Sequence, residues 1–160
     1  MGAGYCEAII PTHRWHSPRA QCWSPDGKFV AYASSETGNW EIYVSPLPSF
    51  SSKWQVSRND GGEEPRWRRD GKELFYLAPD GRLMAAEIRV GAAFETGSPA
   101  VLFQTHPRQP ISAMDFFSYD VTTDGQKFLV NTKVDTSNSA PLSVILNGAS
   151  ELNGASELEK

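Results

Sequence analysis

One short motif occurs three times in the sequence: an Asp-Gly pair with an apolar, strand-like stretch directly after it. The pairs are Asp26-Gly27, Asp70-Gly71 and Asp124-Gly125, and they lie 44 and then 54 residues apart. A tight hairpin turn needs a residue with positive φ, which glycine adopts freely and aspartate tolerates. The stretches that follow are rich in apolar and aromatic types, which suit strands, and they cover residues 29–33, 74–77 and 128–130. Each copy therefore predicts a strand, a tight turn and a second strand.

The spacing of the motif matches one blade of a β-propeller, which holds four short strands and their turns. Further strand-like segments complete the units and cover residues 41–44, 53–56, 83–88, 100–103 and 142–146. One loop insertion at residues 106–110 accounts for the longer second interval, since loops absorb length at small cost. We therefore predict an all-β chain, a partial β-propeller of about three four-stranded antiparallel blades.

The predicted propeller segment covers residues 20–147, divided at about 20–62, 63–114 and 115–147. Residues 1–19 form an N-terminal arm that is a candidate for a strand completing a blade. Residues 148–160 form a low-complexity tail, since the hexapeptide at 146–151 is repeated at 152–157. Glycine at every sixth position weakens a helix, so we predict a frayed end.

Composition excludes several classes of protein. Hydrophobic residues make up 39% and charged residues 21% of the chain, the balance of a globular domain rather than a disordered one. The formal net charge of -4 argues against nucleic acid or an anionic membrane as the main partner. No apolar run approaches the roughly 18 residues of a membrane span, and residues 1–10 lack a signal-peptide pattern. We therefore expect no membrane insertion and a cytoplasmic location.

The repeats also carry a family resemblance. Ser-Pro-Asp-Gly-Lys at 24–28, Val-Ala-Tyr at 30–32 and Glu-Ile-Tyr-Val at 41–44 resemble the blade motif of TolB-like, WD-repeat-like propellers. The segments at 65–76 and 119–131 resemble the propellers that follow the kinase domain in many bacterial serine/threonine kinases. The resemblance implies a toroid of four-stranded blades, commonly six or more, that binds proteins or small ligands. The chain carries none of the glycine-loop, His-Arg-Asp or Asp-Phe-Gly elements of a kinase.

Three blades do not close a ring, so each end blade would leave an apolar face and a strand edge bare. Burying about 500 Å² of apolar surface at such a face contributes roughly 12 kcal/mol before the costs of association. We therefore expect self-association, with a homodimer that closes a six-bladed ring as the favoured form. The alternative is a fragment that folds as an open arc.

Residue types that carry chemistry have simpler structural interpretations. His13 and His16 lie between prolines in a predicted loop, and neither they nor His106 has further ligands nearby, so no metal site is predicted. Ser24 lies in the first turn, where it forms local hydrogen bonds. Cys6 and Cys22 are expected as reduced thiols, with a bridge between them left open.

The basic run at 66–69 invites comparison with a stacking and phosphate-binding surface. Strand alternation instead turns Trp67 to the core and leaves Arg66 and Arg68 on a polar outer face. The other tryptophans are interpreted as inter-blade packing; they are Trp15, Trp23, Trp40 and Trp54.

Paired carboxylates at Glu63 and Glu64 could face a propeller channel, although a solvated turn is the preferred interpretation. Asp26, Asp70 and Asp124 are interpreted as turn residues. We assign no catalytic, cofactor-binding or metal-ligating residue and predict a non-enzymatic binding, sensing or scaffold module that recognises a protein or small ligand. Two alternatives remain: a carboxylate-based hydrolase of glycosidase or lactonase type, and a truncated propeller product without a selected activity.

Overall fold

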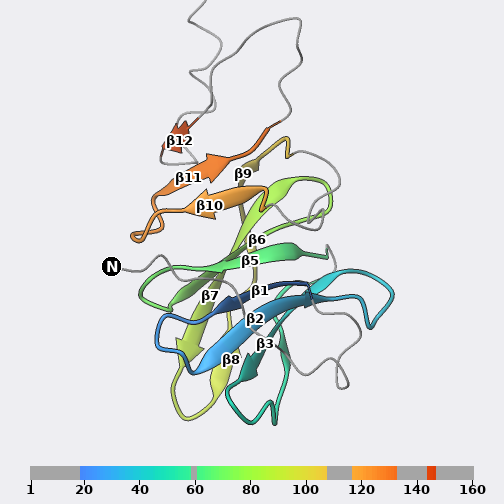
Figure 1. Cartoon of the computed structure of the whole chain (residues 1–160), viewed down its shortest axis with the longest axis vertical. Coiled ribbons are helices and arrows are strands. Elements are labelled where there is room, and N and C mark those ends of the chain that lie inside the picture. The colour runs from blue at the N-terminus through green and yellow to red at the C-terminus, as the bar shows by residue number, and fades with distance from the viewer. Residues whose placement is uncertain (1–18, 59–60, 108–116, 133–143, 147–160) are drawn as a thin grey trace, which may run out of the picture.

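The computed structural model describes residues 19–58, 61–107, 117–132 and 144–146 (Figure 1). All regular structure in these ranges is strand, and no helix that could cross a membrane occurs there. The strands are β1 (Arg19–Trp23), β2 (Phe29–Ser34), β3 (Glu41–Pro46), β4 (Trp54–Gln55), β5 (Glu63–Trp67), β6 (Glu73–Leu77), β7 (Arg82–Val90), β8 (Phe94–Thr96), β9 (Ala100–Gln104), β10 (Tyr119–Val121), β11 (Lys127–Val130) and β12 (Val144–Leu146). The all-β prediction is confirmed.

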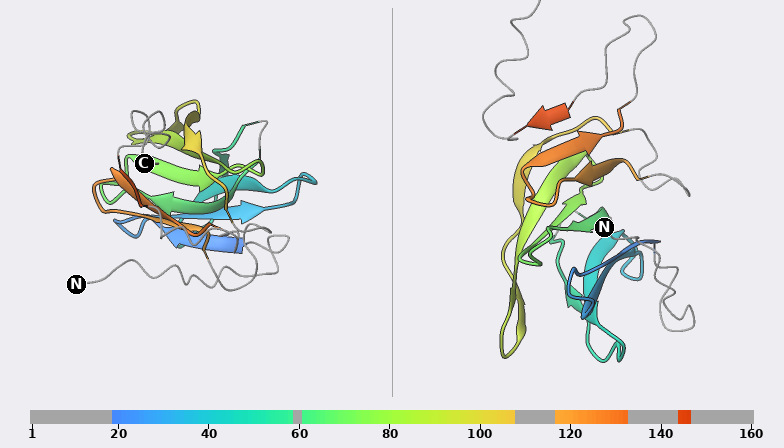
Figure 2. Two further views of the ribbon diagram at one scale, coloured as in Figure 1. Left: turned by 90° about the horizontal axis from the view of Figure 1, so that it is seen from above. Right: turned by 60° about the vertical axis from the view of Figure 1, so that its left-hand side comes forward.

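The strands form three antiparallel sheets. The first sheet has the order β1-β2-β3-β4, the second joins β5, β6 and β7 with β9, and the third has the order β10-β11-β12. The short strand β8, which the sequence analysis did not predict, pairs with the far end of β7. Figure 2 shows the resulting β7–β8 hairpin projecting beyond the rest of the second sheet.

The three Asp-Gly motifs lie in equivalent hairpins. The glycine N–H donates to the carbonyl three residues earlier at 2.9, 2.9 and 2.8 Å, in the order Gly27, Gly71 and Gly125. Their φ angles are 70°, 71° and 74°, in the left-handed region where glycine avoids the strain of a Cβ. The strand pairs that flank the turns correspond as well; they are Trp23 with Val30, Trp67 with Leu74, and Val121 with Phe128. The predicted internal repeat is therefore confirmed.

Strand alternation packs each sheet against its neighbours. In β6, Leu74 and Tyr76 belong to the apolar cluster shared with the first sheet, whereas Phe75 and Leu77 belong to the cluster shared with the third. Successive side chains point to opposite faces of a sheet, so a strand buried on both faces is apolar throughout. The second sheet thus lies between the other two, and we call its contacts with the first and third sheets the first and second junctions.

The first strands of the first two sheets, β1 and β5, each contain a bulge. Their register shifts between Arg19 and Cys22 and between Glu63 and Arg66. Two non-glycine residues with positive φ lie in these shifts, Ala20 at 47° and Glu64 at 55°. A bulge changes the direction of the side chain that it carries. At Glu64 it places a carboxylate inside the second junction.

Candidate binding cleft between the first two hairpins

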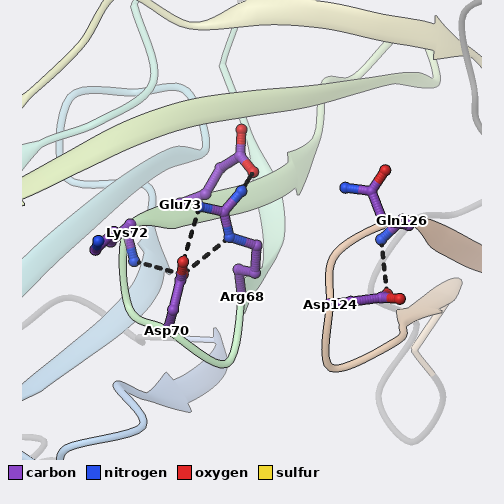
Figure 3. Close-up of polar contacts among 6 residues, drawn as sticks. All are labelled: Arg68, Asp70, Lys72, Glu73, Asp124 and Gln126. Atoms are coloured by element: carbon purple, nitrogen blue, oxygen red, sulfur yellow. Dashed lines mark hydrogen bonds and ion pairs between the residues drawn. The ribbon is translucent and has the colours of Figure 1, made fainter.

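The aspartate of each motif accepts a hydrogen bond within its own turn. The Oδ1 atoms accept the backbone N–H two residues later at 3.1, 3.0 and 3.0 Å, in the pairs Asp26–Lys28, Asp70–Lys72 and Asp124–Gln126. Figure 3 shows the second and third of these pairs. Asp80 makes the same bond to Arg82 at 3.1 Å. These bonds fix the loop tips in the manner of Asx turns. The prediction that the three aspartates are turn residues is confirmed.

The hydrogen bonds also lower the pKa values of these carboxyls. The principal cause is the Ser24 hydroxyl for Asp26, the Arg68 guanidinium for Asp70 and the Thr122 hydroxyl for Asp124. Each interaction favours the ionised form over the protonated one. The side chains are therefore occupied by their own hairpins, and no group of three or more metal-ligating side chains occurs among the described residues.

The hairpin tips meet at the second junction. The Arg69 N–H lies 3.4 Å from the Thr123 carbonyl oxygen. A Cβ at Gly125 would lie only 2.6 Å from Cδ of Arg68, so the arginine stem covers the third tip. Figure 3 shows these two hairpins side by side. The Arg68 side chain therefore occupies the rim between them.

The first junction is open at the same level. The atom nearest to a Cβ placed on Gly71 is Cδ of Pro25 at 3.9 Å, an ordinary van der Waals distance. A cleft of about 650 Å³ lies between the first two hairpins and extends along the end of β7. Its apolar lining includes Phe29, Trp67, Ile88 and Val90.

Trp67 gives this cleft a fixed base. Its ring is only 8% exposed, and Nε1 donates to the Cys22 carbonyl of the first sheet at 3.1 Å. Beside it lies an aromatic cluster of Phe29, Trp54 and Phe94, with ring centroids 5.2 Å apart for Phe29–Phe94 and 4.5 Å for Trp54–Phe94. Phe94 comes from β8, so the projecting hairpin joins the second sheet to the first.

The acidic side chains of the cleft are already paired. Asp70 accepts hydrogen bonds from Nε and Nη2 of Arg68 at 2.9 and 3.0 Å. Glu87 accepts hydrogen bonds from Nε and Nη2 of Arg89 at 2.9 and 2.6 Å. Asp26 accepts the Ser24 hydroxyl at 2.6 Å. Among the described residues, Arg69 and Lys72 form no side-chain ion pair. The cleft therefore contains two cations without an ion pair, in a lining whose three carboxylates and three cations balance.

The basic run at 66–69 is divided by this geometry. Trp67 faces the core, as predicted, and Arg68 bonds to Asp70 and Glu73. The outer-face interpretation is wrong for Arg66, whose side chain is 11% exposed and lies 3.6 Å from the Phe117 ring centroid. Only Arg69 of the run is exposed.

Glu64 also departs from its predicted role. We expected a solvated turn, but the residue is fully buried. Its Oε2 accepts the Ser118 N–H at 2.6 Å and its Oε1 accepts the Ser118 hydroxyl at 2.9 Å. Its carbonyl accepts the Tyr119 hydroxyl at 2.9 Å, and burial raises the pKa of that phenol well above its usual value. The bulge in β5 turns this carboxylate inward, so Glu64 joins the second and third sheets.

The remaining candidates do not line the cleft. Trp40 and Trp54 pack on the first junction as predicted, whereas Trp23 is 44% exposed and packs on no other sheet within the described residues of this chain. Cys22 is buried and His106 is exposed. Cys6, His13, Trp15 and His16 lie outside the described residues. The sequence analysis missed the cleft itself; its only sequence signal is Arg69, which takes the position of Pro25 and Thr123 in the other hairpins.

Comparison with known proteins supports the fold alone. No family model and no curated protein matches the sequence. Among solved structures, TolB from Acinetobacter baumannii superposes with a TM-score of 0.57 at 22% identity, over 82% of this chain and 30% of TolB. A putative TolB from Agrobacterium tumefaciens gives 0.51 at 16% identity, over 76% and 41%. An oligogalacturonate lyase in complex with manganese gives 0.50 at 20%, over 69% and 28%. The chain is thus a partial propeller of TolB-like fold that spans less than half of each of these proteins.

Proposed function

We propose that this chain is a non-enzymatic binding module that recognises a protein ligand at the hairpin rim, in the cleft between the first two sheets. The observation that carries the proposal is the pair of cations without an ion pair, Arg69 and Lys72, above an apolar lining. Asx turns hold both flanking hairpins in place, so little ordering entropy is lost on binding. Concave sites with an apolar lining and a few polar groups are the usual form of ligand sites.

The wider role that we propose is sensing or scaffolding in a bacterial signalling protein. Its support is the resemblance of residues 65–76 and 119–131 to propellers found beside bacterial kinase domains. Propellers host many unrelated activities, so the role depends on the rim and not on the fold.

The carboxylate-hydrolase alternative has lost one of its two residues to a structural role. It required Glu63 and Glu64 to act together at a channel, but both oxygens of Glu64 accept hydrogen bonds from Ser118. A carboxylate held in this way is occupied in the ground state. No observation in the structure favours hydrolysis over binding.

Selection from a displayed library of random heptapeptides tests the binding function. The intact chain is the bait, and the double variant Arg69→Thr with Lys72→Gln, which carries the residues of the third hairpin, is the counter-selection. We expect sequences that are enriched on the chain and depleted on the variant. Enrichment that is equal on both proteins, or no enrichment at all, would rule out this cleft as the binding site.

We further propose that a second copy of the chain completes the propeller. Trp23 in the first sheet is equivalent to Trp67, which packs onto a neighbouring sheet, yet Trp23 is 44% exposed. Leu129 in the third sheet is equivalent to Phe75, which is buried at the second junction, yet Leu129 is 47% exposed. The two exposed positions therefore match the two sides of an internal junction.

Light scattering at micromolar concentration tests this assembly. We expect a mass of at least twice 17.7 kDa for the chain and a smaller mean mass for Trp23→Ser. Val101→Ser is the control, because Val101 is 49% exposed but lies on β9, away from both positions. A monomeric mass for the unchanged chain would contradict the proposal.

A further inference from the structure

We infer that the cleft binds an extended, acidic segment of a partner protein, in which carboxylate side chains alternate with apolar ones. This inference rests on the proposed binding function and adds the class of ligand. Three independent features support it: two cations of the rim without an ion pair, the apolar lining, and an unpaired edge of β7.

Two cations of the cleft that form no ion pair favour an anionic ligand. The three carboxylates of the cleft, Asp26, Asp70 and Glu87, accept hydrogen bonds from protein groups, while Arg69 and Lys72 have no carboxylate within ion-pair distance among the residues that the structure describes. The lining holds three cations, Arg69, Lys72 and Arg89, against these three carboxylates, so it is neutral, whereas the chain as a whole carries a formal charge of -4. A ligand carboxylate would gain charge-assisted hydrogen bonds there without displacing an existing pair.

The apolar lining favours a ligand that is not uniformly charged. Ile88 is buried, with 2% of its surface exposed, whereas Val90 is 57% exposed at the open end of the cleft. Trp67 cannot rotate out of the base, because its N–H is bonded across the first junction. Apolar side chains of a ligand would therefore meet a preformed surface between the two cations and β7.

The edge of β7 favours an extended backbone. The last bond from β7 toward β6 joins the Ile88 N–H to the Lys72 carbonyl at 2.8 Å, and β7 then continues to Val90 without a neighbour on that side in the described residues. The opposite edge pairs with β8, through bonds from Gly97 to Glu87 at 2.8 Å and from Gly91 to Ala93 at 3.1 Å.

Backbone groups of successive residues in a strand point to opposite edges, so the N–H and C=O of Val90 point the same way as those of Ile88. They face the cleft, on the line that β6 would follow beyond Lys72. A segment that adds to this edge as a short strand places alternate side chains toward the cations and the lining. Strand addition therefore explains why acidic and apolar residues should alternate in the ligand.

Three capped heptapeptides test the inference: one with alternating Glu and Val, one with Gln in place of Glu, and one with Lys. Binding to the intact chain is followed by the backbone amide NMR signals of Arg69, Lys72 and Val90. We expect the acidic peptide to shift these signals and to bind about tenfold more tightly than the Gln peptide, a difference that shrinks at high salt. Methylation of alternate backbone nitrogens blocks one hydrogen-bonding edge of the acidic peptide. It should therefore abolish the tighter binding of this peptide.

Matched variants locate the charge effect. Lys72→Gln should weaken acidic-peptide binding about fivefold, the size of a favourable exposed ion pair. Lys28→Gln is the control, because Lys28 occupies the equivalent position in the first hairpin but does not line the cleft. Equal affinity for the Glu and Gln peptides at the same signals would overturn the ligand class and leave the binding function standing. The absence of any shift in the cleft would overturn the inference, and the library selection would then decide the binding function separately.

Discussion

The two junctions are built from the same repeat, but they are held together by different interactions. The first is apolar, with the Trp67 ring bonded to the Cys22 carbonyl and an aromatic cluster supplied in part by β8. The second contains a buried carboxylate, Glu64, whose two oxygens are bonded to Ser118. At the second junction the hairpin tips touch, and at the first they leave a cleft.

The difference shows where a repetitive scaffold gains a binding site. At the first junction the β7–β8 hairpin packs Phe94 against the first sheet. This contact joins the two sheets, so the tips of the first two hairpins need not meet. At the second junction the Arg68 stem fills the corresponding space over Gly125. The departures from the repeat, rather than the repeat itself, distinguish the two rims.

The largest expected effect tests the buried carboxylate of the second junction. Glu64→Ala removes two charge-assisted hydrogen bonds and leaves the Ser118 N–H buried without its acceptor, which should lower the free energy of unfolding by about 4 kcal/mol. Urea denaturation measures this loss. Glu64→Gln keeps one acceptor oxygen and should cost less than the alanine variant. An unchanged midpoint for Glu64→Ala would show that the carboxylate does not hold the junction.

A slightly smaller effect tests the apolar first junction. Phe94→Ala removes the ring that contacts both Phe29 and Trp54, and should cost about 3 kcal/mol. Hydrogen exchange should show faster opening of β8 while the amides of β10 and β11 keep their protection. Equal acceleration in the third sheet would mean that the two junctions open together, and the comparison would then fail.

The contact between hairpin tips is tested by a matched pair of glycines. Gly27→Ala introduces a side chain at φ 70° with no other atom within 4 Å, so the cost should be backbone strain alone, about 1 kcal/mol. Gly125→Ala has nearly the same φ but must also displace Arg68, so it should cost about 2 kcal/mol. Thermal or urea unfolding gives both values, and equal losses would contradict close packing at the second rim.

The smallest effect concerns pH. The folded-state pKa of Asp70 is lowered chiefly by Arg68, so its contribution to stability is present above 3.8 and is lost as the pH falls through the lower folded value. The pKa of Asp124 is lowered chiefly by the hydrogen bond from the uncharged Thr122 hydroxyl. Each Asn variant should lose the part of the pH dependence of stability that its aspartate contributes. Added salt should make this contribution smaller for Asp70 than for Asp124, because only Asp70 depends on a charged partner. Urea midpoints at several pH values, with and without salt, measure the difference.

Local chemistry made much of this fold predictable. The Asp-Gly turns depend on a glycine φ and an aspartate bond that spans two residues, so the sequence around each turn suffices to predict them. The strands of β2 and β6 followed from apolar runs. Two features escaped because their partners are distant in sequence. Glu64 bonds to a residue 54 positions away through a bulge, and the cleft depends on the distance between hairpins that the sequence does not encode locally.

The order of strands within the sheets bears on how the chain folds as it is synthesised. The first sheet is a meander in which every strand pairs with its sequence neighbour, and it is complete by Gln55. A growing chain can therefore assemble this sheet before β5 leaves the ribosome, and Trp67 then finds the Cys22 carbonyl already in place. Interruption of synthesis after the first sheet would leave the apolar side chains that it contributes to the first junction without the second sheet to cover them.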